Sequence, residues 1–110
     1  MSIVSDKNVQ DALIYLADDP HPIAIARKEL TDAENEKERI YAEVYSEKTG
    51  SVRDKETASD GDPRIVRARE AVRDAQFGLE RHKARIRAAE MILEIWRSEN
   101  ANARAAERVR

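Results

Sequence analysis

Side chains that could bind a metal ion are few in this chain. The acidic group Asp54, Glu56, Asp60 and Asp62 offers carboxylate oxygens, but it lacks the spacing of a calcium-binding loop and no histidine accompanies it. The chain has no cysteine, which excludes a zinc–thiolate site, a disulfide and a thiol nucleophile. We therefore expect no metal site and no cofactor.

Acid–base chemistry has equally little support. His82 lies on an apolar helical stripe, where a packed residue is the commoner role and a ligand or pH-sensitive group is the alternative. His21 lies between two prolines, and a role in capping the loop is expected. Lys37 also lies on an apolar stripe, where its methylenes can pack while the ammonium points outward. The sequence predicts no catalytic residue, and we expect that the protein is not an enzyme.

Basic residues are concentrated in the second half of the chain. Residues 1–63 carry a net charge of −7 and residues 64–110 one of +5, within a total of −2. The candidate nucleic-acid contacts are Arg81, Lys83, Arg85, Arg87 and Arg97, because arginine and lysine neutralise phosphates without a sequence motif. The favoured alternative is that the basic run, with the arginines before it, pairs with glutamates of an acidic helix between residues 34 and 47.

The elements that would position these residues are helices. Charged residues make up 38% of the chain, with only three Gly and three Pro. The clearest helix is predicted at about 63–98. Its apolar stripe has unbroken steps of three and four residues and comprises Ile65, Ala68, Val72, Ala75, Leu79, His82, Ile86, Ala89, Leu93 and Trp96. A tail at 99–110 follows, whose composition favours some additional frayed helix.

A second long helix is predicted at about 22–48, with the same spacing at Ile23, Ala26, Leu30, Ala33, Lys37, Ile40 and Val44. Gly50 is expected to end this helix in a left-handed conformation. In the connection at 49–62, Ser51 is expected to cap one or two helical turns. Asp62 is expected to cap the long helix, which starts at Pro63. A short helix at about 6–17 precedes both. The sequence thus predicts a single all-α domain over 1–110, a coiled-coil-like antiparallel hairpin with a short N-terminal helix packed at one end.

The longer arm of the hairpin extends past its partner, and its surplus apolar surface is the candidate interaction site. Residues 88–96 are apolar around much of the helix, so one stripe cannot bury them all. In one interpretation the short first helix covers the rest of this segment, through Leu13, Tyr15 and Leu16. In the other, the segment is an added surface for self-association; the two are compatible. The predicted partner or oligomer interface comprises Met91, Ile92, Ile95 and Trp96.

Two segments, GSVRDK at 50–55 and ILEIWRSENANAR at 92–104, resemble small helical proteins of tailed bacteriophages to which no activity is assigned. The resemblance covers roughly residues 26–104. It implies a phage accessory protein in the cytoplasm of a bacterial host, associated with DNA recombination or replication, and it transfers no catalytic residue.

Taken with the residues, the resemblance favours a non-catalytic protein that acts through helix faces and self-associates, with a dimer favoured. A nucleic-acid-binding accessory factor and an inhibitor of a host protein are the alternatives. A phage or host protein of DNA metabolism is a further expected partner. No membrane association is expected, since the longest nearly apolar stretch is short and contains Glu94.

Overall fold

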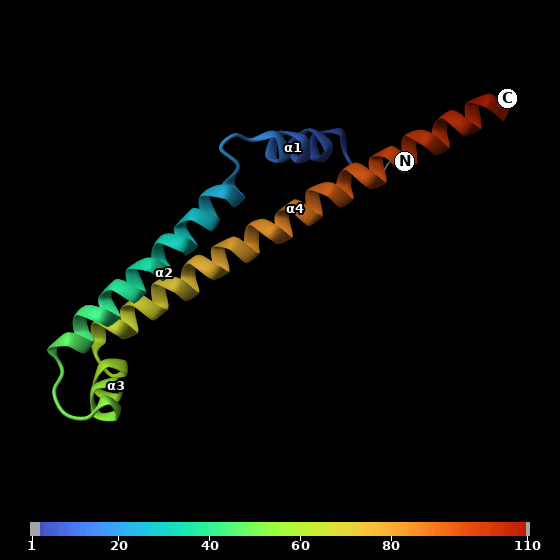
Figure 1. The fold of residues 1–110 in the computed structure, drawn as a ribbon. Coiled ribbons are helices and arrows are strands. Elements are labelled where there is room, and N and C mark those ends of the chain that lie inside the picture. The colour runs from blue at the N-terminus through green and yellow to red at the C-terminus, as the bar shows by residue number, and fades with distance from the viewer. Residues whose placement is uncertain (1–2, 110) are drawn as a thin grey trace. The chain divides into compact units, whose positions relative to one another are not determined.

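The computed structural model describes residues 3–109; Met1, Ser2 and Arg110 lie outside the described residues. Over the described range the chain forms four helices and no strand: α1 (Asp6–Ala17), α2 (Pro22–Glu47), α3 (Val52–Asp60) and α4 (Pro63–Val109) (Figure 1). The predicted all-α class is confirmed.

Contacts within the chain form two groups. The hairpin unit comprises Ile23–Glu80, and the terminal unit comprises the residues up to Pro22 together with those from Arg81 onward. α4 is one continuous helix that contributes its first part to the hairpin unit and its remainder to the terminal unit. The predicted organisation as a single domain stays a prediction.

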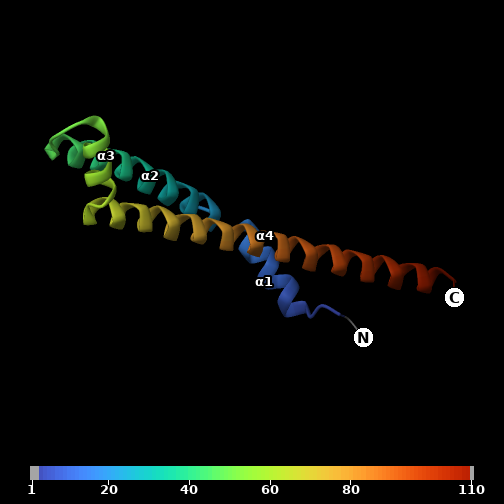
Figure 2. The ribbon, with the colours of Figure 1, turned by 90° about the horizontal axis from the view of Figure 1, so that it is seen from below.

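In the hairpin unit, α2 lies antiparallel beside the first part of α4, as both ribbon views show (Figures 1 and 2). Each predicted stripe residue of α2 is buried or half-buried, and Val44 is completely buried. Ile65 is completely buried on the α4 side, and Ala68 and Leu79 are buried along the same stripe. The predicted hairpin is therefore confirmed, with the heptad spacing selecting its inward face.

Local signals set the ends of these helices. Gly50 has a φ of 105°, a left-handed conformation that glycine adopts without strain, directly after α2. Ser51 and Asp54 form a reciprocal capping box at the start of α3. The Asp62 carboxylate accepts from the Arg64 N–H at 2.9 Å, and Pro63 is the first residue of α4. α3 continues to Asp60, beyond the one or two turns expected.

In the terminal unit, α1 packs on the later part of α4. The Ser5 hydroxyl caps α1 by accepting from the Asn8 N–H. α4 was expected to end at about Ser98, but it continues to Val109. The sequence beyond Ser98 contains neither glycine nor proline and is rich in alanine and arginine, so helix propensity extends α4. Residues 101–108 are exposed.

Candidate interaction surface

The terminal unit has its own apolar core, built from two segments that are far apart in the sequence. Val4, Val9, Ala12 and Tyr15 from the N-terminal segment meet Ala89 and Leu93 of α4. Leu16, Ile86, Ile92 and Ile95 pack around this cluster and are half-buried. α1 thus covers part of the apolar segment of α4, and not all of it as one interpretation expected. Tyr15 and Leu16 take part in this packing, whereas Leu13 is exposed.

Tyr15 forms a polar and aromatic cluster at the C-terminal end of α1. Its hydroxyl lies 3.0 Å from Nδ1 of His82, and its ring meets the His21 ring edge-on with centroids 4.9 Å apart. The Arg85 guanidinium lies 4.0 Å from the centroid of the Tyr15 ring, a cation–π contact. His82 is half-buried and packed, as expected for a stripe residue. His21 contacts Tyr15, a partner that the sequence did not indicate.

The four predicted interface residues have different environments. Met91 is 61% exposed and Trp96 is 37% exposed, so α1 leaves both accessible. Ile92 and Ile95 are half-buried because they pack against the core of the terminal unit. Of the four, Met91 and Trp96 are therefore open to solvent, and the two isoleucines are partly buried within the chain.

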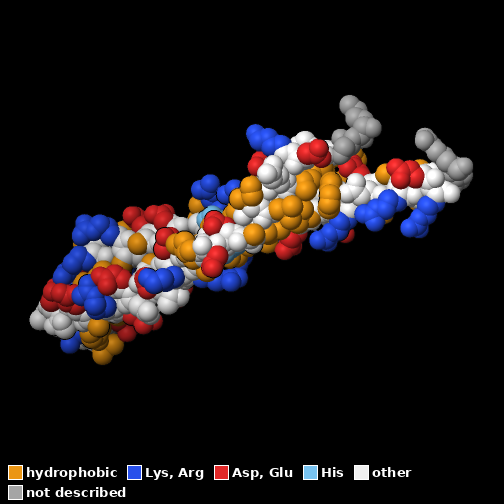
Figure 3. Space-filling model, turned by 90° about the horizontal axis from the view of Figure 1, so that it is seen from above, with side chains coloured by type: hydrophobic (Ala, Val, Ile, Leu, Met, Phe, Trp, Pro, Cys, Tyr) orange, Lys and Arg blue, Asp and Glu red, His pale blue; other side chains and the backbone are white. Residues whose placement is uncertain are grey.

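Further apolar side chains of the terminal unit are exposed. Leu13 is 50% exposed, Ile14 is 63% exposed and Ile3 is 84% exposed. Figure 3 shows hydrophobic side chains gathered along α1 and the adjoining part of α4. Single exposed apolar residues are ordinary on a protein surface, but several on one small unit indicate a binding surface.

A shallow hollow lies beside α1 in this unit. It has a volume of about 170 Å³, and its α4 side is formed by Arg85, Ala88, Ala89 and Ile92. Asn8, Asp11, Ala12 and Tyr15 complete the lining from α1. The alanines leave an apolar floor, while Asp11 and Arg85 provide opposite charges. The sequence did not indicate this hollow.

The predicted nucleic-acid contacts do not form one row. Arg81, Lys83, Arg85 and Arg87 are spaced by two residues, which places successive side chains about 200° apart around a helix. Arg85 contacts the Tyr15 ring, Lys83 is half-buried, and Arg81, Arg87 and Arg97 are exposed. Beyond the segment covered by α1, exposed Arg97, Arg104 and Arg108 follow at spacings of seven and four residues and share one side of α4.

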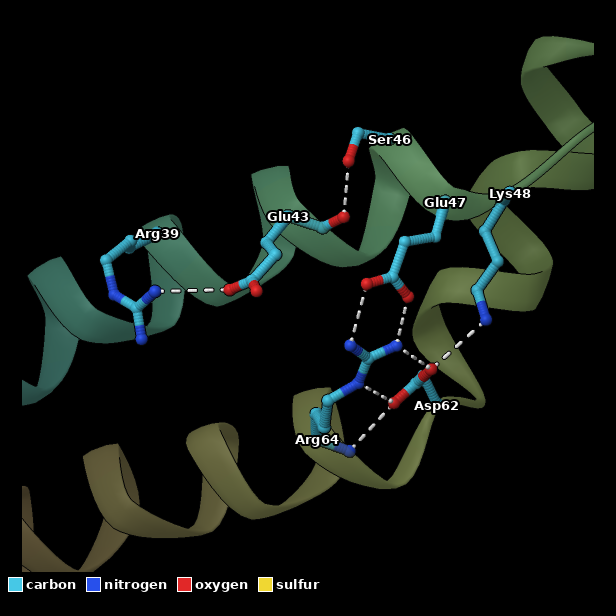
Figure 4. A network of polar contacts seen from close by, with 7 residues as sticks. All are labelled: Arg39, Glu43, Ser46, Glu47, Lys48, Asp62 and Arg64. Atoms are coloured by element: carbon cyan, nitrogen blue, oxygen red, sulfur yellow. Dashed lines mark hydrogen bonds and ion pairs between the residues drawn. The ribbon is translucent and has the colours of Figure 1, made fainter.

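Basic residues near the start of α4 and the end of α2 pair with acidic residues. Among the described residues, the expected pairing between arginines of α4 and glutamates of α2 is found for one arginine. Arg64 makes two hydrogen bonds to the Glu47 carboxylate of α2, one of them 3.0 Å long, and also contacts Asp62 (Figure 4). Lys48 Nζ lies 3.1 Å from Asp62 Oδ2. Arg69 pairs with Asp60 of α3 at 2.7 Å, whereas Glu36 and Glu43 pair with Arg39 of their own helix.

This network lowers carboxylate pKa values. Hydrogen bonds from the Arg64 side chain and backbone, and from Lys48, hold the pKa of Asp62 well below its usual value. The Arg64 hydrogen bonds also lower the pKa of Glu47. The network joins the C-terminal end of α2 to the start of α4, at the closed end of the hairpin.

A second groove lies in the hairpin unit. It has a volume of about 280 Å³ and is lined by Lys37, Glu38, Tyr41, Ala42, Ile65 and Arg69. Burial, followed by the nearby Asp60 and Glu56 carboxylates, raises the pKa of Tyr41. The phenol therefore stays protonated at neutral pH and does not serve as a base there.

Three of the four acidic residues considered for metal binding have structural partners. Asp54 belongs to the capping box, Asp60 pairs with Arg69, and Asp62 pairs with Arg64 and Lys48. Within residues 3–109, no three His, Asp or Glu side chains are grouped as a metal site would require. In the same range, no helix combines the length and apolar character needed to cross a membrane.

Comparisons with protein-family models, with curated proteins and with solved structures found no match for this chain.

Proposed function

We propose that this protein is a non-catalytic interaction protein that acts through helix faces of its terminal unit and self-associates as a dimer. The observation that carries the proposal is the exposure of Met91 and Trp96 on α4 beside a core that α1 covers only in part. Leaving such side chains in water costs free energy that a partner surface recovers.

The bacteriophage resemblance gives this proposal its biological setting. A small helical accessory protein, working with phage or host proteins of DNA recombination or replication, would use the same exposed face for its partners. The polar groups described above support no catalytic role, because Asp60 and Asp62 pair with cations and Tyr41 is a poor base.

Light scattering coupled to size-exclusion chromatography tests self-association directly. We expect a mass of twice the 12.5 kDa chain at micromolar concentration. Met91→Lys should shift the protein toward the monomer, since it places a charge on an exposed apolar face without disturbing a core position. Val66→Lys is the matched control, because Val66 is 40% exposed in the hairpin unit. A monomer at every concentration up to hundreds of micromolar would overturn the proposal.

A second candidate function is nucleic-acid binding, which the shared side of Arg97, Arg104 and Arg108 favours. Fluorescence anisotropy with labelled single- and double-stranded DNA at low salt measures it. Binding through phosphates should weaken steeply as salt rises, and Arg97→Glu with Arg104→Glu should abolish it. Arg81→Glu with Arg85→Glu tests the other basic segment. No anisotropy change at low salt would exclude this function.

A further inference from the structure

α4 carries a second apolar stripe that its packing against α1 leaves largely exposed. Ala84, Ala88, Met91 and Ile95 follow steps of four, three and four residues, which keep them on one side of the helix. Ala84 and Ala88 are exposed, Met91 is 61% exposed and Ile95 is half-buried. The four residues, here called the back stripe, all belong to the terminal unit.

The centre of the back stripe lies on a different side of α4 from the core against α1, and Ile95 at one end of the stripe packs at the edge of that core. At 100° per residue, the centre of the back stripe is about 130° from Ala89, a core residue against α1. Ala88 also lines the hollow beside α1. The apolar surface therefore continues from the hollow onto the back stripe, and a helix laid along the back stripe would lie next to α1.

The residue sizes along the back stripe are self-complementary. Alanine occupies its first two positions, and the larger Met91 and Ile95 occupy the last two. One two-fold axis perpendicular to α4, between residues 89 and 90, places Ala84 opposite Ile95 of a second copy and Ala88 opposite Met91. Each large side chain then meets a small one, which is the pairing that fills an interface closely.

The charges beside the back stripe have the same symmetry. Arg81 and Arg87 flank its N-terminal half, whereas Glu94 and Glu99 flank its C-terminal half. Arg81, Arg87 and Glu94 are exposed, while Glu99 is half-buried and accepts from the Ile3 N–H at 2.7 Å. In an antiparallel pair, Arg87 comes within about 3 Å, along the axis, of Glu94 in the second copy, and Arg81 within about 1.5 Å of Glu99.

A parallel pair lacks this match. In a parallel pair each residue lies level with the same residue of the second copy. The arginines of both copies, Arg81 and Arg87, would then gather at one end of the contact, and Glu94 and Glu99 of both copies at the other end. Like charges at matching levels oppose association and select the other orientation. Charge and size thus point to the same arrangement, although they come from different residues.

We infer that a second copy of this chain binds the back stripe in antiparallel orientation, through a two-fold axis between Ala89 and Glu90. The inference rests on the proposed self-association and adds the face, the orientation and the register. Such a contact is isologous and closes at two chains.

Spin labels measure the orientation. Because the chain has no cysteine, Arg104→Cys introduces a single labelling site at an exposed position of α4. In the proposed dimer the two labels are separated by 29 residues along the helix axis, so pulsed electron resonance should give about 44 Å. A parallel dimer would hold the two labels at the same level but on outward-facing sides of the paired helices, so it should give roughly 20–30 Å.

Charge exchange tests the register in the whole protein. Arg87→Glu and Glu94→Arg should each raise the dimer dissociation constant roughly 5- to 30-fold, since each variant converts two attractive contacts into repulsive ones. Mixing the two variants should restore the wild-type value to within about threefold, because their heterodimer pairs opposite charges. Arg97→Glu is the control, since Arg97 lies about 180° around the helix from Ala88 and so points away from the back stripe.

The outcomes separate the two proposals. A protein that stays monomeric overturns both. A dimer with a label distance of roughly 20–30 Å, or with no recovery on mixing, overturns the antiparallel register and leaves self-association standing. A distance near 44 Å together with recovery on mixing supports the inferred dimer.

Discussion

The hydroxyl of Tyr15 on α1 lies 3.0 Å from Nδ1 of His82 on α4. This contact joins two segments of the terminal unit that are separated by most of the sequence. Tyr15 is 6% exposed, and its ring also contacts His21 and Arg85. The residue therefore combines apolar burial, a cation–π contact and a hydrogen bond in fixing α1 to α4.

Tyr15→Phe should lower the free energy of unfolding of the terminal unit by about 0.5–1.5 kcal/mol, because only the hydroxyl is lost. Tyr15→Ala should cost about 3–5 kcal/mol, since the buried ring is lost as well. Urea denaturation followed by fluorescence measures both effects. Trp96, the single tryptophan, lies in the terminal unit and is the reporter. Equal losses for the two variants would contradict this assignment.

Ile65→Ala should destabilise the hairpin unit by about 2–5 kcal/mol, because Ile65 is completely buried and its removal leaves a cavity. Val66→Ala is the matched control at the next position, where the side chain is 40% exposed, and should change stability by less than about 0.5–1 kcal/mol. Chemical denaturation followed by circular dichroism at 222 nm compares the two. A small effect at Ile65 would mean that the contact between α2 and α4 is loosely packed.

The same substitution at two glycines should have opposite effects. Gly50→Ala should destabilise by about 1–3 kcal/mol, because φ is 105° and the new Cβ would come 3.1 Å from the Asp54 side chain. Gly78→Ala should stabilise by up to about 1 kcal/mol, because Gly78 is inside α4 and a Cβ meets no atom within 4 Å. Thermal denaturation provides the comparison, and destabilisation by Gly78→Ala would contradict the open environment of that position.

Acid should weaken the hairpin unit through Asp62. The pKa of Asp62 is lower in the folded chain than its usual 3.8, so the folded state binds fewer protons. The resulting stabilisation is complete above the usual pKa and is lost as the pH falls below about 4 toward the folded pKa. Urea midpoints between pH 7 and pH 2 should show the decline.

Asp62→Asn isolates the charge, since asparagine can still cap the start of α4. The variant should be less stable than the wild type at pH 7, and the difference should shrink on acidification toward pH 2. A difference that stays constant with pH would show that Asp62 acts only as a cap.

Much of the hairpin could be predicted because its signals are local. Gly50, Ser51 and Asp62 set helix ends within a few residues of their own positions. The apolar stripe of α2 from Ile23 to Val44 follows the helical period. The predicted helix ends near these residues agree with the structure to within about one residue. Such features depend on backbone conformation and on apolar spacing, which a single sequence contains.

The environment of the candidate site could be predicted only in part. The apolar character of residues 88–96 indicated a surface, but the exposure of Met91 and the partial burial of Ile92 depend on where α1 packs. The contacts of Tyr15 with His21 and Arg85 arise from tertiary packing and leave no local signal. The C-terminal extension of α4 was underestimated because no cap or break marks an end before Val109.

The division of the terminal unit between the two ends of the sequence constrains the order of folding during synthesis. The hairpin unit is complete in sequence once Glu80 has left the ribosome, whereas α1 must wait for Arg81 and the residues after it. At typical translation rates, the interval between Ala17 and Arg81 is roughly 3–13 seconds. During that time Val9, Ala12 and Tyr15 have no native partner on α4, so the nascent N-terminal segment is the part of this chain with most to gain from a chaperone.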